Sequence, residues 1–160
     1  MRKNIKFLPT GFTLIELMLV CILILVLVSI STPLFKRTYE DLRITTSAKE
    51  LASVMRFCRE KAIFERNSYR LILDSDEKTY KVFQKDDKDN KYKPLKSRWG
   101  KIFRIPNSIS LESKEDQIDF MPNGSSTSAS IYLANREGTT YTISIEKRTG
   151  FVRVYESRKE

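Results

Sequence analysis

The chain of 160 residues contains no histidine, five glycines and two cysteines. Without histidine it lacks the commonest general base and the commonest metal ligand of proteins. So few glycines leave no glycine-rich phosphate loop, and no serine, cysteine or lysine lies in a recognisable nucleophile motif. These absences predict a protein that is not an enzyme and that carries no metal and no cofactor.

The two cysteines do not form a disulfide framework. Cys21 lies in an apolar run, and Cys58 lies in the helical segment that follows it. If one helix carries both, their positions are about 55 Å apart, far beyond the reach of a disulfide. The fold must therefore rest on packing rather than on cross-links.

The amino-terminal segment lacks acidic residues. Residues 1–11 contain three basic side chains and no Asp or Glu, and residues 12–30 are apolar except for Thr13, Glu16 and Ser29. As a helix rising about 1.5 Å per residue, this run spans about 28 Å, close to the hydrocarbon thickness of a bilayer. The pattern predicts a cytoplasmic leader, a single membrane-spanning helix and an extracytoplasmic remainder.

Two other interpretations share this pattern. An ordinary signal peptide also has a basic start, an apolar stretch and small residues such as Ser29 and Ser31 near a cleavage site. An uncleaved signal anchor also crosses the membrane once. Neither explains Glu16, because an unpaired carboxylate within the hydrocarbon costs on the order of 2.5 to 3.5 kcal/mol, and less toward the interface. Glu16 is therefore expected to have a partner.

Residues 11–16 read GFTLIE, between the basic leader and the apolar run. This stretch resembles the processing site of the type IV pilin superfamily, which includes the pseudopilins of type II secretion systems. The resemblance implies that a prepilin peptidase cuts between Gly11 and Phe12 and methylates the new amino group of Phe12. It also implies that Glu16 serves assembly by pairing with that amino group on the same or a neighbouring subunit.

The helical pattern continues beyond the apolar run. Pro33 is expected to kink the helix, because it removes a backbone donor and its ring clashes with the preceding turn. Further on, apolar residues recur at spacings of three and four, which predicts one face packed against a sheet. These residues are Ala48, Leu51, Ala52, Met55, Cys58, Ala62 and Ile63. The helix is expected to run to about residue 66 and to stop at Asn67 and Ser68.

The rest of the chain has a strand-like composition with clear turn signals. Residues 69–73 and 80–83 flank a polar loop, which predicts a hairpin. Further strand candidates are residues 102–105, 109–111, 118–120, 131–133, 141–145 and 152–155. We therefore predict an α+β fold in which a long amino-terminal helix packs on a mainly antiparallel sheet. The predicted domains are the cytoplasmic leader 1–11, the transmembrane or filament-core helix 12–36 and the periplasmic globular domain 37–160.

Two segments of the globular part resemble one branch of the superfamily. Residues 118–124 read IDFMPNG and residues 149–154 read TGFVRV. Together with the helix end around Arg59 and Ala62, they resemble minor pseudopilins of the H type and related minor pilins. The resemblance implies a structural subunit of a type II secretion pseudopilus, held in the inner membrane with its globular domain in the periplasm. Its implied partners are other pilin or pseudopilin subunits, an inner-membrane assembly platform and a secreted protein cargo.

A minor type IV pilin for pilus assembly, or for DNA capture in natural transformation, is the alternative. The net charge of +9 falls to about +6 once the three basic residues of the leader are removed, a moderate basic excess. Arg153, Arg158 and Lys159 keep the carboxyl end basic and are the candidate DNA contacts. Related minor pilins often place a basic residue directly after the Thr-Gly turn, whereas this chain has Phe151 there.

One polar loop carries several oxygen ligands. Asp86, Asp87, Asp89 and Asn90 could offer them to calcium, but three lysines are interleaved. The glycine and the late glutamate of a calcium loop are missing. A solvated loop is therefore predicted, and no metal site.

The DNA-capture hypothesis makes a direct prediction. The isolated domain from about Lys36 onward should bind duplex DNA, with an affinity that falls steeply as salt rises, because phosphate contacts release counterions. A salt series with labelled duplex measures this, and absence of binding at low salt removes the hypothesis.

Overall fold

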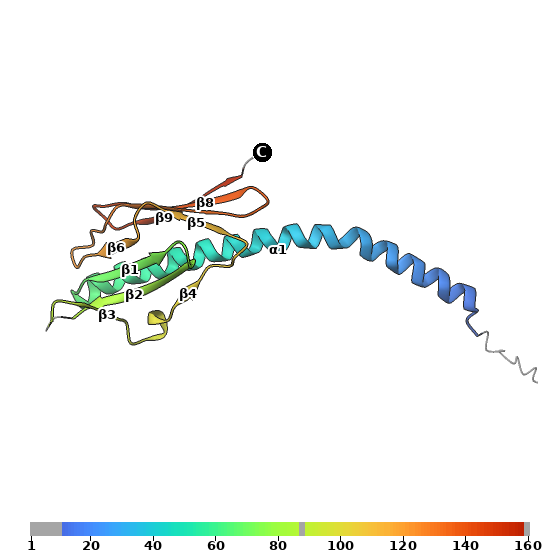
Figure 1. The fold of residues 1–160 in the computed structure, drawn as a ribbon, viewed down its shortest axis with the longest axis horizontal. Coiled ribbons are helices and arrows are strands. Elements are labelled where there is room, and N and C mark those ends of the chain that lie inside the picture. The colour runs from blue at the N-terminus through green and yellow to red at the C-terminus, as the bar shows by residue number, and fades with distance from the viewer. Residues whose placement is uncertain (1–10, 87–88, 159–160) are drawn as a thin grey trace, which may run out of the picture. The chain divides into compact units, whose positions relative to one another are not determined.

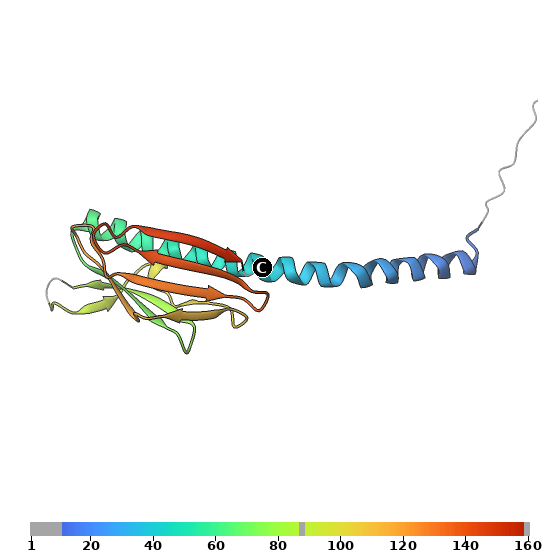
Figure 2. The same cartoon turned by 90° about the horizontal axis from the view of Figure 1, so that it is seen from above.

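The computed structural model describes residues 11–86 and 89–158, and the side chains of all these residues except 31–37 and 158. The chain divides into two units, Met1–Thr38 and Tyr39–Glu160. One helix, α1 (Leu14–Glu65), contributes to both units. The strands that the structure describes all belong to the second unit (Figures 1 and 2).

In the first unit, α1 exposes apolar side chains on every side. Its large apolar residues between Leu14 and Ile30 are 43–77% exposed. Within the described part of the chain, no helix combines the length and the apolar character that a membrane crossing requires. The membrane span predicted over residues 12–36 is not supported by this finding and stays a prediction.

In the second unit, one broad face of α1 is buried. Its buried residues are Ile44, Ser47, Ala48, Leu51, Ala52, Val54, Met55, Cys58 and Ala62. They include most of the predicted stripe, so the predicted packed face is confirmed. The prediction was wrong for Ile63, whose side chain is 42% exposed. This side chain lies beside a turn, where a Cβ built on Gly124 would be 3.5 Å from Cδ1 of Ile63.

The helix ends in a left-handed cap without glycine. Arg66 follows the last helical residue with a φ of 50°, a conformation that favours glycine. The Asn67 amide then donates to the Ala62 carbonyl over 3.2 Å, as in a Schellman motif. The helix therefore stops within about two residues of the predicted position.

The first sheet has five strands in the order β3-β2-β1-β6, with β4 paired to β2. They are β1 (Tyr69–Asp74), β2 (Thr79–Lys85), β3 (Tyr92–Pro94), β4 (Phe103–Arg104) and β6 (Gln117–Phe120). The predicted hairpin is confirmed as β1 and β2, which pair antiparallel with Leu71 opposite Val82. The sequence did not indicate β3, a strand of three residues that includes a proline, a residue depleted in sheets.

The second sheet has four strands in the order β5-β7-β8-β9, and all neighbours are antiparallel. They are β5 (Ser110–Ser113), β7 (Ala129–Ala134), β8 (Thr139–Ile145) and β9 (Val152–Arg158). The sequence suggested one sheet, whereas the strands form two, because β6 pairs with β1 while β5 and β7 pair with each other. The chain crosses from β6 to β7 at the predicted turn, where Gly124 has a φ of 83°.

The second half of α1 packs against both sheets (Figure 1). The hydroxyls of Thr45 and Tyr141, on α1 and β8, share a hydrogen bond of 3.0 Å. Arg56 donates a hydrogen bond of 3.4 Å to the Val152 carbonyl of β9. The Phe57 ring stacks on the ring of Trp99, which belongs to the short helix η1 (Arg98–Gly100), with the ring centres 4.7 Å apart. The predicted α+β fold, with a helix packed on antiparallel strands, is thus confirmed.

A carboxylate near the start of the packed part of α1 ties it to the second sheet. Asp41 Oδ1 accepts hydrogen bonds from Thr139 Oγ1 at 2.9 Å and from Asn135 Nδ2 at 3.1 Å. Asn135 Oδ1 also accepts from the Thr139 amide at 2.9 Å, which closes the turn between β7 and β8. The helix and this turn therefore hold each other in place.

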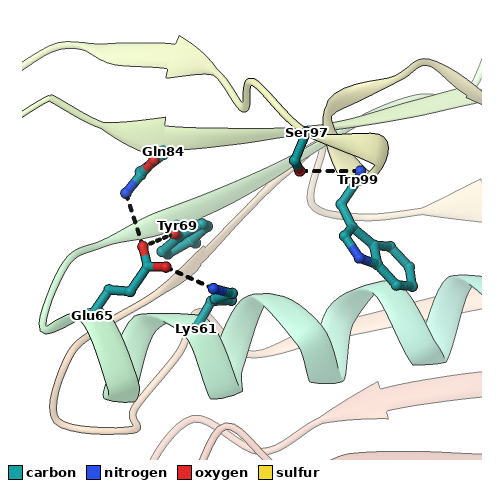
Figure 3. A network of polar contacts seen from close by, with 6 residues as sticks. All are labelled: Lys61, Glu65, Tyr69, Gln84, Ser97 and Trp99. Atoms are coloured by element: carbon teal, nitrogen blue, oxygen red, sulfur yellow. Dashed lines mark hydrogen bonds and ion pairs between the residues drawn. The ribbon is translucent and has the colours of Figure 1, made fainter.

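A second carboxylate ties the end of α1 to the first sheet (Figure 3). Glu65 accepts hydrogen bonds from Lys61 at 2.7 Å, from the Tyr69 hydroxyl, and from Gln84 at 3.1 Å. The Lys61 and Tyr69 bonds lower the pKa of Glu65, while burial and the Glu65 carboxylate raise the pKa of Tyr69. Both strands of the β1–β2 hairpin thus bind one helical side chain.

Replacing Glu65 with glutamine tests how much the hydrogen bonds of its carboxylate stabilise the fold. A carboxylate whose pKa is lowered by folding stabilises the protein above its unfolded pKa, and this stabilisation is lost as the pH falls through the folded pKa. Glu65→Gln should therefore reduce the free energy of unfolding by about 1 kcal/mol at neutral pH, and by less at pH values below about 4. Urea unfolding of the second unit at both pH values measures this. Glu60→Gln, an exposed carboxylate one turn earlier, is the control and should change little at either pH. An equal loss for Glu65→Gln at both pH values would contradict the assignment.

Candidate functional site

The predicted processing and assembly residues lie at the start of α1. Thr13 caps the helix: its hydroxyl accepts from the Glu16 amide at 3.3 Å, and its carbonyl accepts from the Leu17 amide at 3.2 Å. Thr13 and Glu16 also have the Thr-x-x-Glu spacing of a capping box. Sequence reasoning treated Glu16 as a membrane charge that serves assembly and missed the capping role of Thr13, although this spacing could have revealed it.

The amino-terminal end of the helix stabilises the negative charge of Glu16, but by less than this charge would cost within a membrane. Glu16 is exposed and is the acidic residue of the first turn. The positive end of a helix dipole stabilises a carboxylate by about 0.3–1 kcal/mol. The cost of that carboxylate within hydrocarbon is about 2.5–3.5 kcal/mol. A position inside a membrane would therefore still require a further partner.

Gly11 and Phe12 precede the helix and are accessible. Phe12 is 80% exposed, and a Cβ built on Gly11 would have no atom within 4 Å. Gly11 is also not among the residues with a positive φ. Neither packing nor backbone conformation within the described chain therefore requires glycine at this position.

Pro33 does not end the helix. α1 is assigned without interruption from Leu14 to Glu65, through position 33. The predicted kink there stays a prediction.

The candidate DNA contacts lie along β9 and beyond it. Arg153 is exposed, Arg158 is the last residue of β9, and Lys159 lies outside the described residues. The Arg153 guanidinium lies 5.8 Å from the centre of the Phe151 ring, and its interaction with the Tyr155 hydroxyl raises its pKa. DNA binding by these residues stays a prediction.

A lysine of β3 contacts the acidic loop after β2. Lys93 Nζ contacts the Asp86 carboxylate and lies 2.9 Å from that of Asp89, and these hydrogen bonds raise the pKa of Lys93. Asp87 lies outside the described residues. Across residues 11–86 and 89–158, no three His, Cys, Asp or Glu side chains gather as a metal site would require. The described carboxylates of this loop therefore face an ammonium group.

The cysteine of the core is unsuited to nucleophilic chemistry. Cys58 is fully buried, and this burial raises the pKa of its thiol to about 12. The thiol therefore stays protonated at neutral pH, when a nucleophile would need the thiolate. Cys58 acts as a small apolar side chain in the packed face of α1.

The fold is similar to solved minor pseudopilins and minor pilins. The minor pseudopilin EpsH from the type 2 secretion system of Vibrio cholerae aligns with a TM-score of 0.62 at 12% identity, over 71% of this chain and 96% of that one. A second crystal structure of EpsH gives a TM-score of 0.61 at 12% identity, over 72% and 94%. The type IV minor pilin FimU of Pseudomonas aeruginosa gives 0.56 at 14% identity, over 72% and 90%. At these identities the likeness defines the class of fold.

The sequence defines the family. Residues 47–149, more than half of the chain, match the family described as type II transport protein GspH, and the chain therefore belongs to that family. No curated protein matches the chain in sequence. The matched segment begins in the buried face of α1 and ends at the turn before β9. It excludes residues 11–16 and Arg153, so the family match does not bear on the roles of these residues.

Proposed function

We propose that this protein is a minor pseudopilin that is cut after Gly11 and joins the pseudopilus of a type II secretion system through α1. The observation that carries the proposal is the apolar surface of α1, exposed on every side from Leu14 to Ile30. Apolar surface of this extent marks contact with a membrane or with other proteins. Fold and family agree with this role, since both point to pilin-like structural subunits.

The apolar segment would lie first in the membrane and then, after assembly, in the filament. Before assembly, residues 12–36 hold the chain in the inner membrane as a single pass, with the leader 1–11 in the cytoplasm and the globular domain 37–160 in the periplasm. The basic leader supports this orientation. In the filament, the same segment packs against the corresponding helices of other subunits, with an inner-membrane platform driving the assembly.

Glu16 gains its partner from the processing step. Cleavage after Gly11 creates an amino group on Phe12, just before the first helical turn that carries Glu16. Glu16 is the one charged residue of the sequence from 12 to 30. An ion pair with the Phe12 amino group, on the same or a neighbouring subunit, neutralises it where helices pack away from water. A prepilin peptidase that also methylates this amino group leaves it charged.

A minor type IV pilin is the alternative, which the likeness to FimU supports. Such a subunit would help a pilus to assemble or to capture DNA, whereas the pseudopilin would move a secreted protein cargo. Deleting the gene in its host separates the two: loss of secretion with normal pili supports the pseudopilin, and loss of pili with normal secretion overturns it.

The proposed cut has a defined product. Protein from the host membrane should begin at Phe12, carry one added methyl group on its amino terminus, and lack Met1. Intact mass and amino-terminal peptide analysis measure this. Gly11→Val should block the cut without unfolding the protein, since Gly11 lies before α1 with open space around it. A wild-type chain that keeps Met1, or one that is cut near Ser31, would contradict the proposal.

The charge of Glu16 should matter for assembly rather than for insertion. Glu16→Ala removes a carboxylate from an apolar segment, so the amount of protein in the membrane should not fall. Its incorporation into filaments should drop about tenfold or more, because a charged hydrogen bond contributes about 1.5–3 kcal/mol. Counting subunits in sheared filaments by immunoblot measures this.

Two variants control for the helix cap and the charge. Glu16→Asp keeps a carboxylate and should assemble better than Glu16→Ala. Thr13→Ser keeps the capping hydroxyl and should behave like the wild type. Normal incorporation of Glu16→Ala contradicts the pairing role of Glu16.

A further inference from the structure

The outer face of the second sheet differs from the rest of the surface in its chemistry. Residues that alternate with the buried ones along its four strands point away from the core. They are Ser110, Glu112, Ser130, Tyr132, Ala134, Thr140, Thr142, Ser144, Arg153, Tyr155 and Ser157. Most carry a hydroxyl and two carry a charge, whereas 31% of the whole chain is charged. We call this set the hydroxyl face.

The tyrosines and the arginine of the hydroxyl face, and its low share of charge, are features of a protein-binding surface. The cores of protein interfaces are depleted in charge and enriched in tyrosine and arginine, and serine with tyrosine serves recognition in antibody loops. Tyr132 is 42% exposed, Tyr155 is 50% exposed, and Phe151, directly before the edge strand β9, is 52% exposed. These rings lose little conformational entropy when a partner covers them, because each has two rotatable side-chain bonds.

The cation of the hydroxyl face has two aromatic neighbours along the chain. The Arg153 guanidinium lies 5.8 Å from the centre of the Phe151 ring, and its interaction with the Tyr155 hydroxyl raises its pKa. An arginine with such neighbours loses less side-chain freedom when it meets a carboxylate. A carboxylate is therefore the group that a partner should present to Arg153.

The strand register places such a carboxylate on the same face. Glu112, Tyr132, Thr142 and Tyr155 stand in one row across β5, β7, β8 and β9. Arg153 lies two residues along β9 from the end of this row, about 7 Å away. The two charges of the hydroxyl face therefore lie on the opposite edge strands, β5 and β9.

We propose that the hydroxyl face binds the hydroxyl face of a second copy of this chain. A two-fold axis parallel to the strands lays β9 of one copy over β5 of the other. Arg153 then lies within about 7 Å, measured along the strands, of the other copy's Glu112, and this pair forms twice. Sheets packed face to face lie about 10 Å apart, a gap that tyrosine and arginine side chains fill.

The size of the hydroxyl face sets the strength of this contact. Four strands spaced about 4.8 Å apart and about six residues long present roughly 400 Å² per copy. A stable complex buries about 800 Å² per partner. The pairing is therefore weak in dilute solution and becomes populated where copies are held close together, since tethering raises their effective concentration.

The second unit, residues 39–160, is suited to the test because it holds the buried apolar core of the described chain. Sedimentation velocity over a concentration series reaching the millimolar range should show a monomer–dimer equilibrium. Arg153→Glu and Glu112→Arg should each weaken the dimer at least fivefold, since each places like charges together. The double variant Arg153→Glu with Glu112→Arg should recover the wild-type dissociation constant within about threefold.

Two further variants make the result specific. Lys49→Glu makes the same charge change as Arg153→Glu at an exposed position of α1, and should leave the dimer unchanged. Thr142→Lys places a cation in the middle of the hydroxyl face and should weaken the dimer, so it provides the test if Arg153→Glu fails to fold by circular dichroism.

Three outcomes overturn the proposal: a wild-type domain that stays monomeric throughout, a dimer that the single exchanges leave intact, and single exchanges that the double variant does not repair. This test does not involve the leader, Gly11 or Glu16. Its failure would leave the proposed filament function standing, and a failure of the predicted processing would leave the hydroxyl-face dimer standing.

Discussion

The burial of one broad face of α1 against two sheets is the constraint on which the second unit depends. The inner faces of both sheets consist of fully buried apolar residues, such as Leu71 and Val82 in the first and Ile131 and Ile143 in the second. The apolar face of a sheet must be buried against another element, and here the single helix α1 packs against the apolar faces of both sheets. Small residues at Ala48, Ala52 and Ala62 are fully buried, which lets the helix backbone approach the strands closely. Cys58 belongs to the same face, and this explains its inert thiol.

Two carboxylates fix where α1 lies along the sheets. Asp41 binds the turn between β7 and β8 in the second sheet, whereas Glu65 binds β1 and β2 in the first. They are about 36 Å apart along the helix. Apolar packing alone resists sliding only weakly, because neighbouring turns of a helix present similar surfaces. Directional hydrogen bonds at both ends of the packed segment specify one position, and they connect each sheet to the other through the helix.

The sequence revealed the features that depend on local pattern and hid those that depend on distant pairing. The spacing of apolar residues located the packed face of α1, and alternation with turn residues located β1, β2 and the later strands. The division into two sheets was hidden, because it depends on whether β6 pairs with β1 or with β7, and the alternation of Ile118 and Phe120 does not indicate which strand is the partner. At the candidate site, the pattern around Gly11 and Glu16 was visible in the sequence. The approach of Arg153 to the Phe151 ring was not, because strand twist and side-chain rotamers decide it.

Packing and the family match explain the globular part of the chain. Packing does not explain the residues at the start of α1. The family match covers residues 47–149, where burial accounts for most of the apolar positions. Outside it, Gly11 has room for a side chain, and Glu16 carries a charge that the helix dipole only partly stabilises. A helix start built for folding alone would keep Thr13 as its cap and replace Glu16 with glutamine, which completes the same capping box without a charge. The charge is therefore the feature that demands a partner. In the proposed function, the amino group that cleavage would form next to it is that partner, available when the apolar helix would leave lipid for protein.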